Sequence, residues 1–254
     1  MTSKFLPVFA KNALLEAHQA LPGLIDGSAK EADVLAVCGH FRRRGLCELL
    51  FEGAPERLHR FLFMSGCAYL HFLERAVPAA RHVSKAAPFF DALASMDLQR
   101  ARRIALASTA PFNPKREYEE DFLYVQRLMG MVAQRTEPAE VRARHAALCM
   151  ETDDARWHLV EALLHDDTAR LNDALTRMLR EEASRWRRLH EEGAVREEEA
   201  ATEMHVCIEG LALAWLAQQR GLGTLSDYPQ VPSLARIVPD ERPAAELWMD
   251  PMRW

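Results

Sequence analysis

The sequence predicts an all-α protein built from stacked antiparallel helical hairpins, arranged as an α-solenoid or a bundle. Apolar residues recur at helical spacing along almost the whole chain, and no proline occurs between Pro138 and Pro229. Eleven glycines in 254 residues, with few Asn-Gly or Asp-Gly pairs, leave little material for β-hairpin turns. We expect one helical domain over residues 1–220 and an irregular, Pro-rich tail over residues 221–254 that packs on the helices.

The first half of the chain contains two long helical segments followed by shorter ones. The segment "KEADVLAVCGHFRRRGLCELLFEG" carries an apolar stripe that predicts a helix ending at Gly53, where glycine suits a C-terminal cap. Pro55 opens the next helix, because a missing N–H costs nothing at the first helical position. Shorter helices follow Pro78, and the helical pattern resumes over residues 115–132.

The second half contains four predicted helices, separated by the acidic breaks "ETDD", "HDDT" and "HEEG". One aspartate of each of the first two breaks is placed to accept a hydrogen bond from a free amide of the next helix. The tail holds Trp248 and Trp254, which would lose much favourable burial if the tail were free of the helices. The four predicted helices are 138–150, 155–165, 168–191 and 197–220.

The segment "EALLHDDTARLNDAL" at residues 161–175 echoes "ELLFEGAPERLHRFL" at residues 48–62. Glu48 aligns with Glu161 and Arg57 with Arg170, and both segments predict a helix, a short turn and a second helix. Convergence explains the matches about as well as duplication does, because helical hairpins share apolar spacing and acidic N-termini. The echo therefore indicates stacked helical pairs without identifying a named repeat.

Composition and charge favour a protein that binds neither nucleic acid nor membrane. The net charge is −5, neither terminus carries a long run of one sign, and we expect the runs Arg42 to Arg44 and Arg185 to Arg188 to be solvated helix faces. The longest apolar stretch, near residues 210–217, is far shorter than the roughly 18 residues of a membrane span. Five cysteines without a CxxC pair indicate neither disulfides nor a zinc site, and predict a reduced, cytoplasmic protein.

The sequence contains little sign of catalytic chemistry, so we expect neither a cofactor nor an enzymatic activity. Phosphate-binding, zincin and nucleophile-elbow motifs are absent. Glu56 and His59 form one ExxH, a spacing that di-iron bundles use twice, but the pair His71 and Glu74 is reversed. The cysteines of the apolar stripes suit the role of small buried hydrophobes better than that of nucleophiles; they are Cys38, Cys67 and Cys207.

Acidic clusters are the best candidates for a function carried on the surface. They are either solvated, capped helix ends or the electrostatic footprint for a basic protein partner, in which charge speeds encounter and aromatic side chains supply affinity. Aromatic residues lie close to them in the sequence. The predicted surface consists of Tyr118, Glu119, Glu120, Asp121, Asp153, Asp154, Trp157, Asp166 and Asp167.

Three C-terminal segments carry a resemblance to a known family: "DDARWHLVEALLHDD", "EEAATEMHVCIEGLALAWLAQQRGL" and "DYPQVPSLA". Together they cover about residues 150–236 and resemble the Imm49 type of immunity protein from bacterial polymorphic toxin systems. The resemblance implies an all-helical cytoplasmic protein that docks on one cognate toxin and blocks its active site or substrate path. It carries no site residue over.

Two alternatives stay open beside an immunity protein. The echoed hairpins fit an αα-hairpin scaffold or adaptor. The side chains of Glu56, His59, His71 and Glu74 would instead form the metal site of a helical metalloenzyme, if the fold brings them together.

Overall fold

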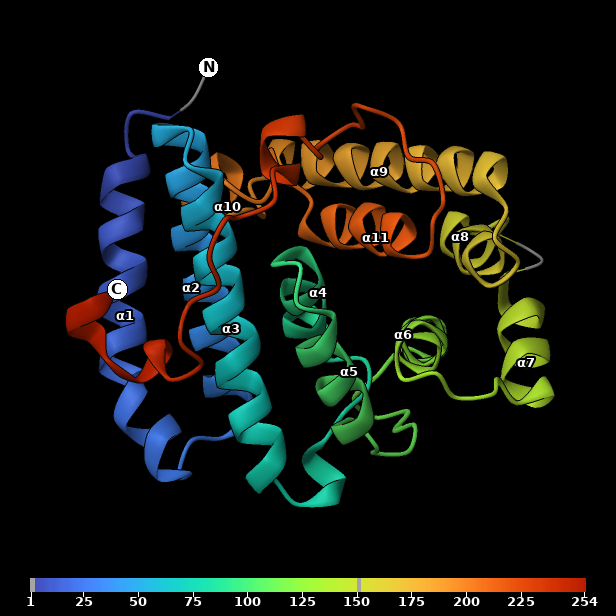
Figure 1. Cartoon of the computed structure of the whole chain (residues 1–254), viewed down its shortest axis with the longest axis horizontal. Coiled ribbons are helices and arrows are strands. Elements are labelled where there is room, and N and C mark those ends of the chain that lie inside the picture. Colours follow the sequence, from blue (N-terminus) through green and yellow to red (C-terminus); the bar gives the residue numbers. More distant parts are fainter. Residues whose placement is uncertain (1–2, 150–151) are drawn as a thin grey trace.

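The computed structural model describes residues 3–149 and 152–254, and this part of the chain contains eleven α-helices and no β-strand (Figure 1). The predicted all-α fold is confirmed. The helices are Leu6–Asp26 (α1), Glu31–Glu52 (α2), Pro55–Arg75 (α3), Ala87–Ala94 (α4), Leu98–Ala107 (α5), Glu119–Val132 (α6), Ala139–Cys149 (α7), Ala155–Leu164 (α8), Thr168–Glu191 (α9), Glu197–Ala201 (α10) and Ile208–Gln219 (α11).

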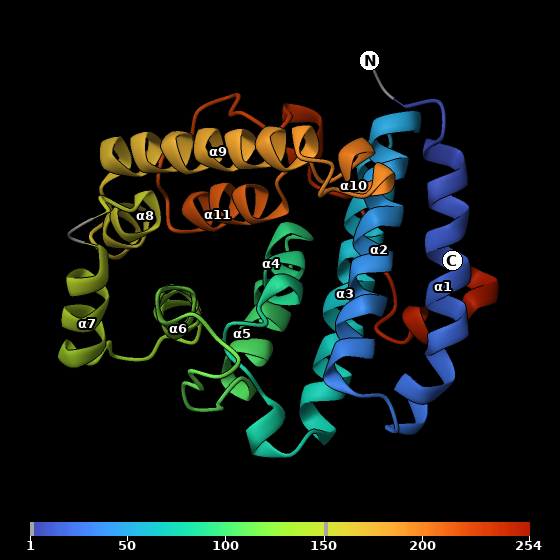
Figure 2. The same cartoon turned by 180° about the vertical axis from the view of Figure 1, so that it is seen from behind.

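Helices α1, α2 and α3 stand side by side as an antiparallel layer at one end of the molecule (Figures 1 and 2). As predicted, α2 ends at Gly53, whose φ of +66° forms a left-handed cap, and Pro55 opens α3. Gly45 lets the two helices approach closely, because an added Cβ would lie 3.1 Å from the Leu58 carbonyl oxygen and 3.2 Å from the Cβ of Phe61.

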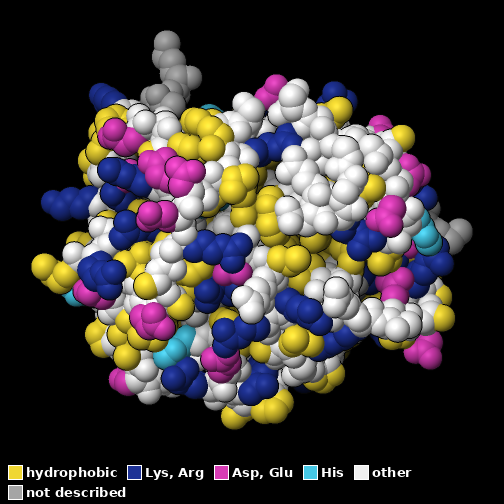
Figure 3. Space-filling view, in the orientation of Figure 1, with side chains coloured by type: hydrophobic (Ala, Val, Ile, Leu, Met, Phe, Trp, Pro, Cys, Tyr) yellow, Lys and Arg dark blue, Asp and Glu magenta, His cyan; other side chains and the backbone are white. Residues whose placement is uncertain are grey.

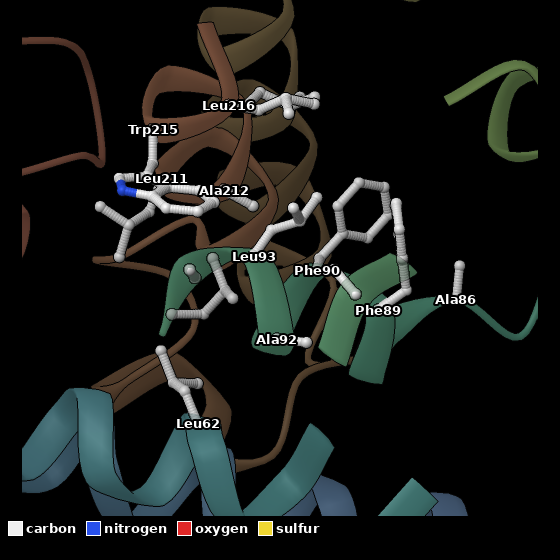
Figure 4. Close-up of a cluster of buried hydrophobic side chains, with 14 of the residues drawn as sticks. Leu62, Ala86, Phe89, Phe90, Ala92, Leu93, Leu211, Ala212, Trp215 and Leu216 are labelled. Atoms are coloured by element: carbon white, nitrogen blue, oxygen red, sulfur yellow. The ribbon is translucent and has the colours of Figure 1, made fainter. Parts of the chain in front are cut away.

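Helix α4 joins this layer to the rest of the protein. It lies between α3 and α11, with Leu62 of α3 on one side and Leu211 and Trp215 of α11 on the other (Figure 4). Residues 88–94 are all buried, as expected of a helix that is apolar nearly all round. One of them, Asp91, is a carboxylate.

Asp91 is fully buried and its carboxylate is held by two neighbouring helices. Arg42 of α2 donates two hydrogen bonds to it, with N–O distances of 2.7 and 2.8 Å, and the hydroxyl of Ser65 in α3 donates a third. A bidentate guanidinium satisfies both carboxylate oxygens, which offsets much of the cost of burying the charge. The three side chains therefore fix α2, α3 and α4 relative to one another.

The prediction that Arg42 to Arg44 form a solvated face is wrong. Arg43 is buried and lies 3.4 Å from Glu203, while Arg44 forms an ion pair with Glu48 one turn further along α2. Together with the Arg42–Asp91 pair, these contacts place all three guanidinium groups in ion pairs. A run of cations in a helix is thus divided among different acidic partners according to which side of the helix each one faces.

The echoed segments both form helix–turn–helix pairs, α2 with α3 and α8 with α9. The aligned carboxylates Glu48 and Glu161 are both buried, and each is held by two arginines. Arg57 binds Glu48 in the first pair at 2.7 Å, but the aligned Arg170 binds His158 instead. The likeness therefore extends to the buried acid and not to its partners.

The predicted helix 197–220 is interrupted, which corrects that expectation. Helix α10 ends at Ala201 beside α2, and α11 begins at Ile208 and packs on α4 (Figure 2). One straight helix could not follow both directions. The backbone amide of Cys207 bonds to the Gln230 carbonyl of the tail at 2.8 Å instead of continuing a helix. The segment 115–132 likewise becomes helical only from Glu119.

The tail runs from α11 back across α3 to the N-terminal layer (Figure 1). It is irregular apart from three short 3₁₀ turns within residues 233–253. Trp248 is only 2% exposed and lies edge-on against His71, with ring centres 4.9 Å apart. Trp254 meets Phe41 at 5.0 Å. The two tryptophans anchor the end of the chain on α2 and α3.

No helix within residues 3–149 and 152–254 combines the length and apolar character that crossing a lipid bilayer requires.

We predict that Asp91→Leu lowers the free energy of unfolding by about 3–5 kcal/mol, because it leaves the Arg42 guanidinium without its partner. The double variant Arg42→Met/Asp91→Leu should lose less, since neither charge remains. Urea titrations would measure both. The matched control Asp173→Leu, at an exposed position of α9, should change stability by about 0.5 kcal/mol or less. Equal losses for the single and double variants would contradict this account.

Candidate functional site

The described structure contains an open groove of about 920 Å³. Residues from α4, α6, α8 and α9 and from the segment leading into α11 line it. Eight carboxyl groups line the groove against three guanidinium groups. The acids are Glu120, Asp121, Asp153, Asp154, Glu181, Glu182, Glu203 and Glu209, and the cations are Arg42, Arg156 and Arg185.

Carboxylates outnumber cations in the groove lining, by eight to three. On the face seen in Figure 3, basic and acidic side chains are interspersed. Inside the groove the cations are already committed: Arg42 holds the buried Asp91, and Arg185 donates to Glu182 at 2.6 and 2.9 Å. The groove therefore presents an excess of negative charge to any molecule that enters it.

Arg156 organises the acids at one wall. Its guanidinium lies 2.7 Å from Asp121 of α6 and 3.2 Å from Asp154, which also caps α8 through the Arg156 amide. It lies over the ring of Tyr124, 5.2 Å from the centroid. These contacts outweigh desolvation and raise the pKa of Arg156 above its ordinary value. Arg156 thus tethers the start of α6 to the start of α8.

The groove lining also contains a carboxyl group that forms no ion pair with the described residues. Glu209, in the first turn of α11, accepts a hydrogen bond of 2.6 Å from the hydroxyl of the buried Tyr124. Within residues 3–149 and 152–254 it forms no ion pair. Burial raises the pKa of Glu209, although Tyr124 and Arg156 oppose the shift. The groove floor therefore holds an acid that is poorly compensated.

Apolar side chains share the groove with these acids. Phe90 of α4 and Met178 of α9 are buried next to the space, and Trp186 lies two turns further along α9 than Met178. The Arg185 guanidinium lies 5.9 Å from the Trp186 ring centre. Apolar surface beside fixed charges is typical of sites that bind a side chain with an apolar stem and a polar end.

Four of the nine predicted surface residues line the groove: Glu120, Asp121, Asp153 and Asp154. Asp153 binds Arg177 at 2.7 Å. Glu120 is exposed and has no ion pair in the part of the chain that the structure describes. The fold thus brings two acidic sequences, more than thirty residues apart in the chain, to one place.

The other five predicted residues lie outside the groove lining. Tyr118 is 75% exposed next to it, at the start of α6, and Glu119 forms an ion pair with Arg144 of α7. Asp167 caps α9 through the amide of Arg170. The remaining two are Asp166, which binds Arg220, and Trp157, which is half-buried.

Trp157 belongs to a buried cluster around Arg127. The Arg127 guanidinium lies 4.5 Å from the Trp157 ring centre and donates to Glu161 of α8. Arg142 of α7 donates to the same carboxylate at 2.6 and 3.2 Å. Burial alone would raise the pKa of Glu161, but the hydrogen bonds from Arg142 and Arg127 lower it to about 2. The cluster joins α6, α7 and α8, so Trp157 has a structural role.

Sequence reasoning missed four acids of the groove: Glu181, Glu182, Glu203 and Glu209. Glu182 could have been found, because Met178, Glu182 and Trp186 follow one another at four-residue spacing and share a face of α9. No local signal marked Glu203 or Glu209. Glu203 lies within the helix break that the sequence did not predict, and Glu209 follows it in the first turn of α11.

The four residues of the metal-site hypothesis do not converge. His59 is buried and its Nδ1 lies 2.9 Å from the Ala94 carbonyl oxygen, whereas Glu56 is exposed. His71 faces Trp248, and Glu74 forms an ion pair with Arg103. Among the described residues, no group of three or more His, Cys, Asp or Glu side chains is placed to hold a metal ion.

The cysteines are poor nucleophiles in this environment. Cys38 and Cys67 are buried in the helical core, and Cys207 lies in the wall of the groove. Burial raises the pKa of each of these three thiols to about 12. The thiolate, which is the reactive form, is therefore scarce at neutral pH.

Comparison with known proteins gives the chain a family. The sequence model of the immunity protein 49 family matches residues 69–234. The chain belongs to this family. Searches of curated proteins and of solved structures found no match. The resemblance seen in residues 150–236 is thereby confirmed and extends to Tyr69 in α3.

The immunity protein 49 match contains the entire groove lining except Arg42. It also contains Asp91, the buried carboxylate that holds Arg42 in place. Helices α1 and α2 and the first two thirds of α3 lie outside the match. The groove is therefore built on the part of the chain that the family describes.

We predict that stability at acidic pH depends on Glu161. Its pKa is about 2 in the folded chain against 4.5 ordinarily, so its contribution is present above pH 4.5 and is lost as the pH falls toward 2. Glu161→Gln should cost on the order of 3 kcal/mol at pH 7. Urea unfolding at pH 7 and pH 3 should show the difference from wild type shrinking. The exposed control Glu140→Gln should show no such pH dependence.

Proposed function

We propose that this protein protects the cell that makes it by binding one cognate toxin in a stoichiometric complex. Membership of the immunity protein 49 family is the observation that carries the proposal. The groove supports it, because a concave site with uncompensated acids and apolar side chains suits a complementary basic surface. The protein acts by contact, in the cytoplasm, without catalysis and without a cofactor.

The groove and its rim are the surface that we propose for the toxin. Glu120, Asp121, Asp153 and Asp154 supply charge at the wall, and the exposed ring of Tyr118 stands beside them as an aromatic anchor. Aromatic side chains often dominate binding energy at such interfaces. Glu119, Trp157, Asp166 and Asp167 do not line the groove and are left out of the refined surface.

Co-expression tests the proposal directly. The tagged chain is produced together with the product of the adjacent gene, and the two are expected to elute at equal stoichiometry while the toxicity of the neighbour is relieved. Absence of a complex together with unrelieved toxicity would overturn the proposal. Recovery of several unrelated housekeeping proteins instead would favour the scaffold function that the echoed hairpins suggested.

Charge reversal at Glu120 should slow association with the toxin. This side chain is exposed and forms no ion pair among the described residues. Glu120→Lys therefore makes the electrostatic potential of the groove less negative without breaking an ion pair. Stopped-flow mixing at low ionic strength should show a severalfold lower association rate, and added salt should reduce the difference. Glu140→Lys, on an exposed face of α7 outside the groove, is the control. Equal rates for Glu120→Lys and wild type would remove this wall from the interface.

A further inference from the structure

The carboxyl group of Glu209 is the feature of the groove that internal contacts leave unexplained. One of its oxygens accepts the Tyr124 hydroxyl, and no hydrogen bond to the other is formed by residues 3–149 or 152–254. The side chain is partly exposed and lines the groove. A carboxylate oxygen in such a place can pair with a cation that enters the groove.

Each charged group near Glu209 already has another partner. Arg156 of α8 binds Asp121 and Asp154, while Arg185 of α9 binds Glu182. Glu182 and Asp121 face Glu209 as further negative charges, and the thiol of Cys207 lies nearby. Tyr124 of α6 supplies a neutral hydrogen bond. The local charge is therefore negative on balance, and burial strengthens its effect on an incoming cation.

The size and lining of the groove indicate what kind of cation enters. A space of about 920 Å³ is at the upper end of the range for ligand sites, which is far more than one ammonium group fills. Glu120, exposed at the rim, is a second acid without an ion pair among the described residues. Met178 and Trp186 line the groove with surface on which the stem of an arginine can lie.

We propose that the groove binds an arginine-containing basic segment of a partner protein, with one guanidinium beside Tyr124 paired to the Glu209 carboxylate and a second basic side chain at Glu120. The inference rests on the proposed function in one respect: the partner that carries the segment is the toxin. Arginine fits better than lysine, because its planar fork of N–H donors suits a carboxylate oxygen such as the free one of Glu209.

The test uses acetylated octa-arginine as the probe and octa-citrulline, which has the same shape without the charge, as its control. Fluorescence anisotropy measures binding to the full chain at 150 mM salt. Octa-arginine should bind and octa-citrulline should not. Glu209→Gln, which keeps an acceptor for Tyr124, should weaken binding about tenfold, or about 1.4 kcal/mol. Trp186→Ala should weaken it as well.

Glu241→Gln is the matched control, because it removes one exposed negative charge outside the groove. It should leave the affinity unchanged. Circular dichroism should show that all variants fold like wild type. If Glu209→Gln does not, Glu209→Asp takes its place and should bind octa-arginine more weakly than wild type, because the shorter side chain withdraws the carboxylate from the incoming guanidinium.

Three results would overturn the proposal. These are no binding of octa-arginine, equal weakening by Glu209→Gln and Glu241→Gln, or tighter binding of spermidine than of octa-arginine, which would indicate a small polycation. Failure here is separable from failure of the proposed function. A chain that still forms the toxin complex and relieves toxicity, but does not bind octa-arginine, retains its immunity function and loses this assignment of the groove.

Discussion

The buried carboxylate of Asp91 is the constraint on which the rest of the structure depends. It lies in the helix that joins the N-terminal layer to α11, and it is satisfied only if Arg42 and Ser65 approach from α2 and α3. Because an unpaired buried charge is costly, any packing of α2, α3 and α4 that separates Asp91 from Arg42 and Ser65 is disfavoured. The same contact turns Arg42 into part of the groove wall, so the position of the site follows from the packing of the core.

A second set of ionic contacts shapes the other side of the groove. Arg127 and Arg142 converge on Glu161, and Arg156 joins Asp121 to Asp154. The contacts around Glu161 and those around Arg156 each hold α6 and α8 at fixed positions relative to each other. Once these internal pairs are complete, Glu120 and Glu209 are left without a cation among the described residues, and they supply unpaired negative charge to the groove.

The acidic breaks show how one sequence feature can have two roles. Asp154 and Asp167 cap helices, as their position after a turn suggested. Asp154 also lines the groove, whereas Asp167 does not. Capping depends on a few neighbouring residues and is local. Whether a residue lines the groove depends on which helices face each other, and a segment of fifteen residues carries no information about that. For this reason the sequence placed Trp157 on the predicted surface, although its ring packs on Arg127.

The sequence by itself determined the all-α fold, the helix ends at Gly53 and Pro55, the caps of α8 and α9, and the family. These depend on periodicity, local hydrogen bonding and residue identity, which are properties of short segments. Only the tertiary structure decided the break between α10 and α11, the burial of Arg42 with Asp91, and the meeting of Glu209 with Tyr124. Each of these joins residues distant in the chain, and their energies arise from desolvation and charge pairing, which exist only once the helices have packed.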